Sequence, residues 1–305
     1  MMSLESKATR RSSLLSILLV LLILFKLNGE WNSVAAHEQA HAGQTPHTLT
    51  GDIRLHRGFH SRFLSGSRDI IVYLPPGYEN EHTRRYPTLY MQDGQNIFDA
   101  ATSFFPGMER HLDERAEALI KQKIIQPLII VGIYSNGLNR INEYTPTKLP
   151  GTDWGGEADL YGRLLVEEIK PFIDQRYRTL SGASNTGLGG SSLGGLLSIY
   201  LGIKHADTFG KLALSSPASY WDDEMIVRAV HALRAKPHQR VWLDIGTAEP
   251  VGFLNSTRSL HEALIGKRWK EGIDLRYMEV AGGQHNPAAW AERVDRLLTF
   301  LFPRP

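Results

Sequence analysis

The 305-residue sequence contains no cysteine, so no disulfide bond can stabilise its fold. Stability must come from a hydrophobic core, and a chain of this length with 42% hydrophobic side chains can bury a large one. The sequence also lacks a dense run of lysine or arginine in its main part, and its net charge is only +2. It therefore gives no electrostatic reason to expect a nucleic-acid partner. Internal repeats and long low-complexity segments are absent as well.

Apolar, strand-like segments alternate with amphipathic helical segments through most of the chain. We predict strands at 69–74, 86–93, 127–134, 185–191, 211–215, 241–246 and 274–280. We predict helices at 108–122, 157–175, 193–205, 222–235, 255–270 and 287–301. This alternation predicts an α/β fold in which one mostly parallel, doubly wound sheet carries helices on both faces.

Residues 1–36 have the layout of a secretory signal peptide. Arg10 and Arg11 precede a nearly uninterrupted apolar run from Ser12 to Leu27, and residues 34–36 supply small side chains for cleavage. We therefore expect export to the periplasm or the exterior, with membrane contact only through this segment. Two alternatives stay open, namely an uncleaved signal anchor and a twin-arginine export signal.

Two motifs that would indicate a metal or a cofactor lie in the wrong context. The H-E-x-x-H motif at 37–41 would bind zinc on a packed helix, but it stands in a stretch with no core to pack against, and we interpret 37–51 as a solvated linker. The glycines at 187, 189 and 190 begin a dinucleotide-binding pattern, but Ser192 stands where its third glycine belongs. We therefore predict no metal and no cofactor.

Residues 190–194, Gly-Ser-Ser-Leu-Gly, match the G-x-S-x-G nucleophile elbow between a predicted strand and a predicted helix. The flanking glycines fit a turn so tight that a side chain there would collide with a neighbouring element. The strained backbone holds the serine hydroxyl outward. Ser192 is therefore the candidate nucleophile, and an ordinary glycine-rich turn is the alternative interpretation.

A serine nucleophile requires a base and an orienting acid, here in the chain order serine, acid, histidine. The base candidate is His285, in a glycine-rich loop before the last predicted helix. The acid candidate is Glu249, which follows a predicted strand where that strand reaches the carboxyl edge of the sheet. Asp222 and Asp223 are alternatives for the acid. Asp244 ranks lower, because it lies inside a strand and should point into the packing of the sheet.

The same chemistry requires two N–H groups that stabilise the oxyanion formed when the serine attacks. One is the N–H of the residue after the nucleophile, which is Leu193. The other comes from the loop after an earlier central strand, and Gln95 in the Gly-Gln-Asn segment after strand 86–93 is our candidate.

Four further side chains are candidates for contact with a substrate: Arg140, Glu143, Trp154 and Trp221. Arg140 and Glu143 stand in a loop that can reach over the sheet edge. A surface ion pair is the alternative for these two residues. Packing in the core is the alternative for the two tryptophans.

Four segments together carry a resemblance to a known family: 93–99, 131–146, 170–180 and 190–195. They resemble the putative-esterase family of α/β-hydrolases, which includes enterochelin-esterase-like, esterase D-like and feruloyl-esterase-like proteins. The resemblance runs from about residue 52 to the C-terminus, so we assign 52–305 to the catalytic domain. It implies ester hydrolysis through an acyl-enzyme, no cofactor, and a Ser-Glu/Asp-His triad that falls on Ser192, Glu249 and His285.

The resemblance leaves the substrate open among small-molecule or glycan esters, including siderophore, feruloyl and sugar esters. Two other functions stay open. One is acyl transfer to a sugar or lipid acceptor, because mycolyltransferases are relatives of this family. The other is a non-catalytic binding module that retains the fold. The sequence does not indicate an oligomeric state.

Overall fold

The computed structural model describes residues 45–304. The predicted signal segment 1–36 and the H-E-x-x-H motif at 37–41 lie outside the described residues. A compact unit begins at His47, so residues 47–51, which we predicted to be linker, already belong to it. Among the helices of the described residues, none is long and apolar enough to cross a membrane.

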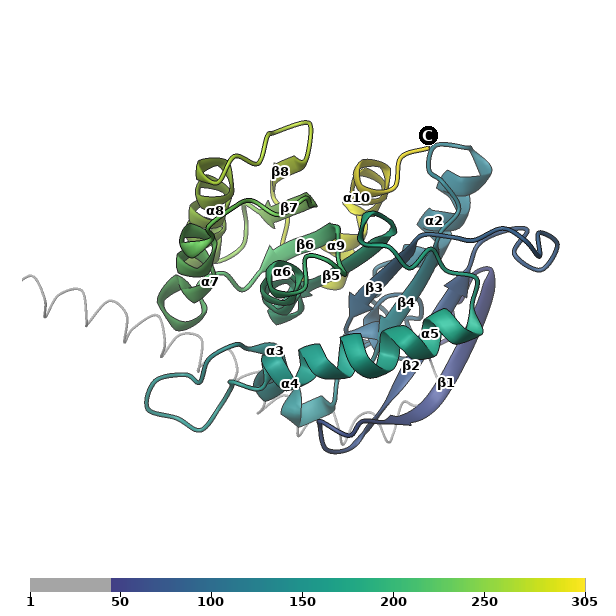
Figure 1. The fold of residues 1–305 in the computed structure, drawn as a ribbon, viewed down its shortest axis with the longest axis horizontal. Helices are drawn as coiled ribbons and strands as arrows, with labels where there is room; N and C mark the ends of the chain where they lie inside the picture. Colours follow the sequence, from purple (N-terminus) through teal and green to yellow (C-terminus); the bar gives the residue numbers. More distant parts are fainter. Residues whose placement is uncertain (1–44, 305) are drawn as a thin grey trace, which may run out of the picture. The chain divides into compact units, whose positions relative to one another are not determined.

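One eight-stranded sheet forms the centre of the described structure (Figure 1). Its strands are β1 (Asp52–His60), β2 (Ser67–Leu74), β3 (Thr88–Gln92), β4 (Ile129–Ile133), β5 (Thr186–Ser192), β6 (Lys211–Pro217), β7 (Arg240–Gly246) and β8 (Leu275–Val280). They lie in the order β1-β2-β4-β3-β5-β6-β7-β8. The β1–β2 and β2–β4 pairs are antiparallel, and the other pairs are parallel. The predicted fold class, a mostly parallel α/β sheet, is confirmed.

The sheet has a hydrophobic core on each face, because successive strand residues point to opposite sides. In β2, Ile70 and Val72 pack in one core, whereas Ile71 and Tyr73 pack in the other. The first core is completed by buried side chains of the helices α4 to α8, and the second by those of α2 and α10. This arrangement is the two-sided burial expected of a doubly wound sheet.

The helices are α2 (Leu112–Lys121), α3 (Arg140–Tyr144), α4 (Ala158–Arg163), α5 (Lys170–Arg176), α6 (Leu193–Lys204), α7 (Trp221–Ala232), α8 (Val251–Gly266), α9 (Pro287–Ala291) and α10 (Val294–Leu301). Figure 1 shows α4 and α5 crossing one face of the sheet in front of the first strands. The helices α2 and α10 contact each other, and α10 also contacts β6 and β7.

The structure differs from the predicted elements at four places. The helix predicted at 157–175 is divided into α4, a π-helical segment at Leu164–Ile169, and α5, whose Pro171 has no N–H to continue a regular pattern. The helix predicted at 287–301 is interrupted between α9 and α10. The prediction missed β1, an edge strand with an irregular burial pattern, and α3, which has only five residues.

The strands β3, β5, β6, β7 and β8 run in the same direction, so their carboxyl ends lie along one edge of the sheet. In open α/β sheets this edge is where ligands bind. The predicted site residues follow these ends: Gln95 after β3, Ser192 at the end of β5, Glu249 after β7 and His285 after β8. The fold thereby brings residues that are distant in sequence to one side of the molecule.

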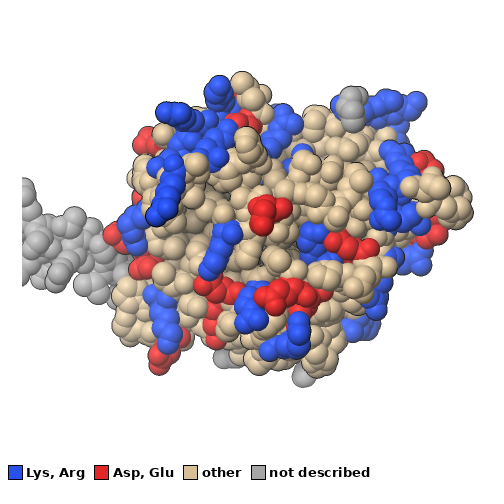
Figure 2. Space-filling model, viewed as in Figure 1, with Lys and Arg blue, Asp and Glu red and all other residues tan. Residues whose placement is uncertain are grey.

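Basic and acidic side chains are interspersed on the face of the molecule shown in Figure 2. Many charged groups of the described chain are paired, as in the contacts of Lys204 with Asp159 at 2.6 Å and of Arg258 with Glu279 at 2.7 Å. On the face shown in Figure 2, lysine and arginine cover more of the surface than aspartate and glutamate, with acidic groups placed between them.

Candidate active site

The turn after β5 has a strained backbone at the predicted nucleophile. Ser192 is the last residue of β5 and directly precedes α6, and its backbone angles are φ 55° and ψ −125°. Residues other than glycine rarely adopt a positive φ. Such strain persists only where the surrounding structure enforces it, and it is frequent at functional sites. Ser192 is also partly exposed, although the rest of β5 is buried.

Close contacts surround both glycines of the elbow, Gly190 and Gly194, and those of Gly190 are with backbone atoms. A Cβ atom on Gly190 would lie 2.6 Å from the carbonyl carbon of Gly194. A Cβ atom on Gly194 would lie 3.0 Å from the Cβ of Gln92, in the adjacent strand β3. Backbone atoms cannot move aside as the end of a flexible side chain can. The elbow therefore tolerates no side chain at position 190.

We expect the substitution Gly190→Ala to lower the free energy of unfolding by about 1–3 kcal/mol, because the added methyl group overpacks the turn. Urea unfolding of the variant and the wild type measures this difference. Gly252→Ala is the matched control, since Gly252 lies in α8 and a Cβ atom there meets nothing within 4 Å. The control should be neutral or slightly stabilising. Equal losses in the two variants would contradict the argument from close contact.

Glu249 and His285 form a hydrogen-bonded pair. The His285 Nδ1 atom lies 2.6 Å from the Glu249 Oε2 atom. The other oxygen of Glu249 accepts hydrogen bonds from the Ser216 hydroxyl at 2.5 Å and from the Gly246 N–H at 2.9 Å. Burial raises the pKa of Glu249, but the hydrogen bond and the charge of His285 lower it by more, so the pKa lies below its ordinary value. Glu249 is therefore an ionised, fully buried acceptor for the imidazole.

Aromatic rings fix the position of the His285 imidazole. Trp290 lies edge-on to it at 5.0 Å between ring centroids, and Phe253 lies edge-on at 5.4 Å. Tyr220 stacks on Phe253 at 4.1 Å. The Trp290 indole N–H also donates to the Ser216 hydroxyl, which itself contacts Glu249. The imidazole is thus oriented by one carboxylate and two rings, and a partly exposed aromatic pair stands beside it.

The alternative acid candidates lie elsewhere. Asp222 and Asp223 begin α7 in a left-handed conformation, and the carbonyl oxygens of both accept hydrogen bonds from Arg228. In the described part of the chain, neither of their carboxylates contacts His285. Asp244 is fully buried in β7 and is hydrogen bonded to Trp242 and Arg293. Of the four acids considered, Glu249 is the one whose carboxylate reaches the imidazole.

Strand pairing places the elbow next to this pair. Ser192 is paired with Pro217 across the β5–β6 ladder, and the Ser192 carbonyl accepts the N–H of Ala218 at 2.9 Å. The residue before Pro217 is Ser216, whose hydroxyl contacts Glu249. In the described residues, the Ser192 hydroxyl and His285 share no direct hydrogen bond. The structure thus joins Glu249 to His285 and brings Ser192 to the same edge of the sheet.

The two predicted oxyanion donors lie at this edge as well. Leu193 is the first residue of α6, so its N–H has no acceptor within the helix. Gln95 lies in the 3-10 turn Gly94–Asn96 after β3. Its side chain is held by Ser135 through two hydrogen bonds, of 3.0 Å and 3.2 Å, which fix the loop. The adjacent Asp93 lies against the first turn of α6, where it would contact a Cβ on Gly194 at 3.1 Å.

Arg140 is bound to Asp93, a residue for which the sequence had suggested no role. Its guanidinium makes two hydrogen bonds of 2.7 Å to the Asp93 carboxylate and lies 4.9 Å from the Tyr144 ring. Burial would lower the pKa of Arg140, but the charge of Asp93 and its hydrogen bonds raise it above the ordinary value. The side chain is 25% exposed. Arg140 therefore fixes the loop that carries Gln95 and retains a partly accessible edge.

The other three predicted substrate contacts have different environments. Glu143 is fully buried and binds Arg68 through two hydrogen bonds of 2.8 Å and 3.2 Å. Trp221 is 4% exposed and donates its indole N–H to Thr147, so it packs against the loop that follows α3. Trp154 is 39% exposed. These placements favour a structural role for Glu143 and Trp221, and leave Trp154 accessible.

A buried polar network under the elbow was not predicted from the sequence. Arg110 donates to the Ser191 hydroxyl at 2.8 Å and to the Ser215 hydroxyl at 3.1 Å. Ser215 in turn contacts Asp244, which also binds Arg293 at 2.6 Å. Burial lowers the pKa of Arg110 to about 10. The network connects the residue next to Ser192 with the residues that surround Glu249.

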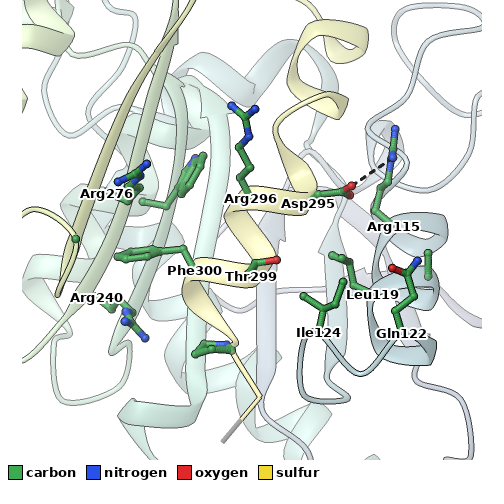
Figure 3. A pocket seen from close by; sticks show the side chains of 14 residues that line it. Arg115, Leu119, Gln122, Ile124, Arg240, Arg276, Asp295, Arg296, Thr299 and Phe300 are labelled. Atoms are coloured by element: carbon green, nitrogen blue, oxygen red, sulfur yellow. Dashed lines mark hydrogen bonds and ion pairs between the residues drawn. The ribbon is translucent and has the colours of Figure 1, made fainter.

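A groove of about 700 Å³ lies away from these residues, between α2, α10 and the strands β7 and β8 (Figure 3). Figure 3 shows Arg115, Arg240, Arg276 and Arg296 around it. Arg240 is the first residue of β7, whereas Glu249 follows the other end of that strand. The groove is therefore at the amino end of β7 and is separate from the His285–Glu249 pair.

Comparisons with known proteins agree with this architecture. A family model described as "Putative esterase" matches residues 61–301. An uncharacterized protein of Bacillus subtilis is 28% identical over 259 residues, which make up 81% of this chain and 97% of that protein. The iron(III) salmochelin esterase of Escherichia coli is also 28% identical over 259 residues, but these make up 76% of this chain and only 56% of the relative.

The fold is similar to that of a solved esterase. The crystal structure of the enterobactin esterase from Shigella flexneri superimposes with a TM-score of 0.65 at 17% sequence identity. The alignment covers 85% of this chain and 62% of the other. At this identity the likeness concerns the fold alone.

Proposed function

The chain belongs to the putative esterase family and is a carboxylic ester hydrolase, and from this premise we propose that Ser192, Glu249 and His285 are its catalytic triad. The observation that carries the proposal is the 2.6 Å hydrogen bond between His285 and a buried, ionised Glu249. The strained backbone of Ser192 at the same sheet edge supports it. The order of the three residues along the chain also agrees with this family of folds.

The proposed mechanism proceeds through an acyl-enzyme. Glu249 holds the Nδ1 side of His285, which leaves Nε2 free to accept the proton of the Ser192 hydroxyl as this attacks the ester carbonyl. The N–H groups of Leu193 and Gln95 stabilise the resulting oxyanion. His285 then donates its proton to the departing alkoxide. A water molecule, deprotonated by His285, then attacks the acyl-enzyme, and His285 returns this proton to the Ser192 oxygen as the acid is released.

We assign the substrate to the class of esters with an aromatic ring, such as feruloyl and catecholate-siderophore esters. The stacked pair of Tyr220 and Phe253 supports this assignment, because it offers a partly exposed aromatic surface beside His285. The salmochelin esterase and the enterobactin esterase are named for siderophore esters, which gives independent support. Sugar esters are the alternative substrate, and transfer of the acyl group to a sugar or lipid is the alternative reaction.

A panel of acetyl, feruloyl, glycosyl and catecholate-siderophore esters tests the proposal. We expect hydrolysis of the feruloyl or catecholate esters with the highest kcat/KM, followed as release of the free acid. Each reaction is repeated with a trehalose-like acceptor at high concentration. Preference for the glycosyl ester would overturn the aromatic assignment, and an acylated acceptor as the main product would overturn hydrolysis.

We expect Glu249→Gln to lower kcat on a p-nitrophenyl ester by about 10³- to 10⁴-fold, because the amide cannot hold the imidazole in the required tautomer. Steady-state kinetics at pH 7 measure the change. Asp222→Asn and Asp223→Asn are matched controls that remove one carboxylate each and should leave kcat within about twofold. A large loss in either control, with activity kept in Glu249→Gln, would transfer the role of the acid to α7.

We also propose that residues 1–36 export the chain and are then removed. The proposal is supported by Arg10, Arg11 and the apolar run that follows them. Mass determination of the mature protein from its native compartment tests it, with a new N-terminus near Ala36 as the expected result. A full-length chain retained in the membrane fraction would instead indicate a signal anchor.

A further inference from the structure

Two carboxylates and one imidazole lie together at the start of α2, outside the candidate active site. One ligand atom each from Glu109, His111 and Glu114 can be chosen so that all three lie within 4.8 Å of one another. His111 is the residue before α2 and has a left-handed backbone, with φ 53° and ψ 36°. Strained conformations of residues other than glycine cluster at ligand and active sites.

The distances within this cluster are poor for hydrogen bonds. The His111 Nδ1 atom lies 3.4 Å from the Glu114 Oε1 atom and 3.6 Å from the Glu109 Oε1 atom. Good hydrogen bonds between nitrogen and oxygen are about 2.7–3.2 Å long. Two ligands of a tetrahedral zinc ion, each about 2.0–2.2 Å from the metal, are about 3.3–3.6 Å apart. The observed separations fit two ligands of one ion better than two direct hydrogen bonds.

The carboxylate of Glu109 is buried and incompletely hydrogen bonded, which favours a bound cation beside it. Its side chain is 1% exposed, and its Oε2 atom has no hydrogen-bond partner. Its other oxygen accepts the hydroxyl of Thr48. The Oε2 atom of Glu114 is buried as well, but this carboxylate has the carboxyl group of Asp113 as a hydrogen-bond neighbour. Within residues 45–304, no lysine or arginine forms an ion pair with either carboxylate, and an unpaired buried charge is costly.

We infer that Glu109, His111 and Glu114 bind one divalent transition-metal ion, for which Zn²⁺ is the best fit. Imidazole nitrogen together with carboxylate oxygen is a ligand set that suits zinc, whereas calcium and magnesium prefer oxygen alone. Three protein ligands leave a fourth position for water. His111 is 45% exposed and Glu114 31%, so an ion can enter from solvent. The hydrogen bond from Thr48 supplies the outer contact that orients a ligating carboxylate.

Such an ion would fix two segments of the chain. Arg110 lies between two of the ligands, and its side chain reaches the Ser191 hydroxyl beside the elbow. Thr48 belongs to the segment that leads into β1, and its hydroxyl donates to Glu109. The site is therefore assigned a positioning role, separate from the ester chemistry proposed for Ser192.

Zinc binding to the purified full chain tests the inference. The H-E-x-x-H motif at 37–41 could also bind zinc, so every measurement uses a background with His37→Ala and His41→Ala, without an affinity tag. After removal of metal, equilibrium dialysis against ZnCl₂ should give one Zn²⁺ per chain. His111→Ala and Glu109→Gln should each weaken binding by at least about 100-fold. Zn²⁺ should also raise the melting temperature of the background protein, and raise it less in His111→Ala.

His261→Ala is the matched control, because His261 stands near one carboxylate, Glu271, at 3.8 Å but belongs to no cluster of three ligands in the described chain. It should bind zinc as the background does. Because His111 is exposed, its variant should fold even if Glu109→Gln does not. Binding below 0.1 Zn²⁺ per chain, unchanged binding in His111→Ala, or stronger binding of Ca²⁺ or Mg²⁺ than of Zn²⁺ would each overturn the inference. None of these readouts depends on esterase activity.

Discussion

Replacing Ser192 with alanine is expected to lower kcat on a p-nitrophenyl ester by about a millionfold, the size of loss seen when a triad serine is removed. The same variant should lose all covalent labelling by a fluorophosphonate probe. Ser216 near His285 also has a positive φ, but it is buried and its hydroxyl donates to Glu249. Ser192 combines a positive φ with a partly exposed side chain, so we expect it to be the residue that reacts. Both measurements use purified protein at pH 7, and the probe is read by intact mass.

Ser191→Ala is the control for this experiment, because it removes the neighbouring hydroxyl and retains the proposed nucleophile. Ser191 is buried and hydrogen bonded to Arg110, so its loss can slow the reaction but should leave one probe molecule per chain. If Ser192→Ala kept wild-type hydrolysis, the proposed nucleophile would be wrong. If the wild type never reacted with the probe, the non-catalytic binding module would become the better interpretation.

Replacing Glu143 with alanine is expected to lower the free energy of unfolding by about 3–5 kcal/mol. The substitution leaves Arg68 as an unpaired charge whose side chain is 0% exposed. The free energy needed to remove the Arg68 guanidinium from water is no longer compensated once its two hydrogen bonds to Glu143 are lost. Urea unfolding measures the loss, and the KM of the folded fraction should stay close to that of the wild type.

The double variant Arg68→Met with Glu143→Leu is the partner experiment. It removes both charges and fills the space with apolar side chains, so most of the lost stability should return. If Glu143→Ala instead raised KM strongly and hardly changed stability, the substrate contact suggested by the sequence would be correct. The pair of variants therefore distinguishes a structural carboxylate from one that contacts the substrate.

The seven predicted strands are all present, because each contains an apolar run. Six of them are mostly buried, and the seventh, β8, is a partly exposed edge strand. The eighth strand, β1, was missed because Arg57 and Gly58 interrupt its apolar residues and none of its residues is buried. The hydrophobic periodicity of a sequence reflects which residues are buried, so a strand without buried residues has a weak pattern. The break between α9 and α10 was missed for another reason. The break lies at Arg293, the residue before α10. The Arg293 side chain binds Asp244 in β7, and such a contact between distant residues leaves no local pattern in the sequence.

The candidate site was predictable where local sequence determines the chemistry. The glycines around Ser192 and the position of Glu249 after a strand are local signals, and both led to residues at one sheet edge. The roles of Asp93 and Arg110 could not be predicted from the sequence. Asp93 binds Arg140, and Arg110 binds Ser191, and the partners in each pair are distant in sequence and meet only in the folded chain. The one available signal in the sequence was the Asp-Gly step directly after a central strand, which is typical of a turn. The structure gives Asp93 a left-handed backbone there.

The last two helices carry side chains that complete the surroundings of His285. Trp290 packs against the imidazole, and Arg293 binds both Asp244 and the hydroxyl of Ser216. A polypeptide still leaving the ribosome therefore lacks these contacts until α9 and α10 have emerged and docked. Reactivity through the proposed triad would then arise only after α9 and α10 have docked on the assembled strands β5 to β8. An incomplete chain released early would carry Ser192 without the contacts that surround His285.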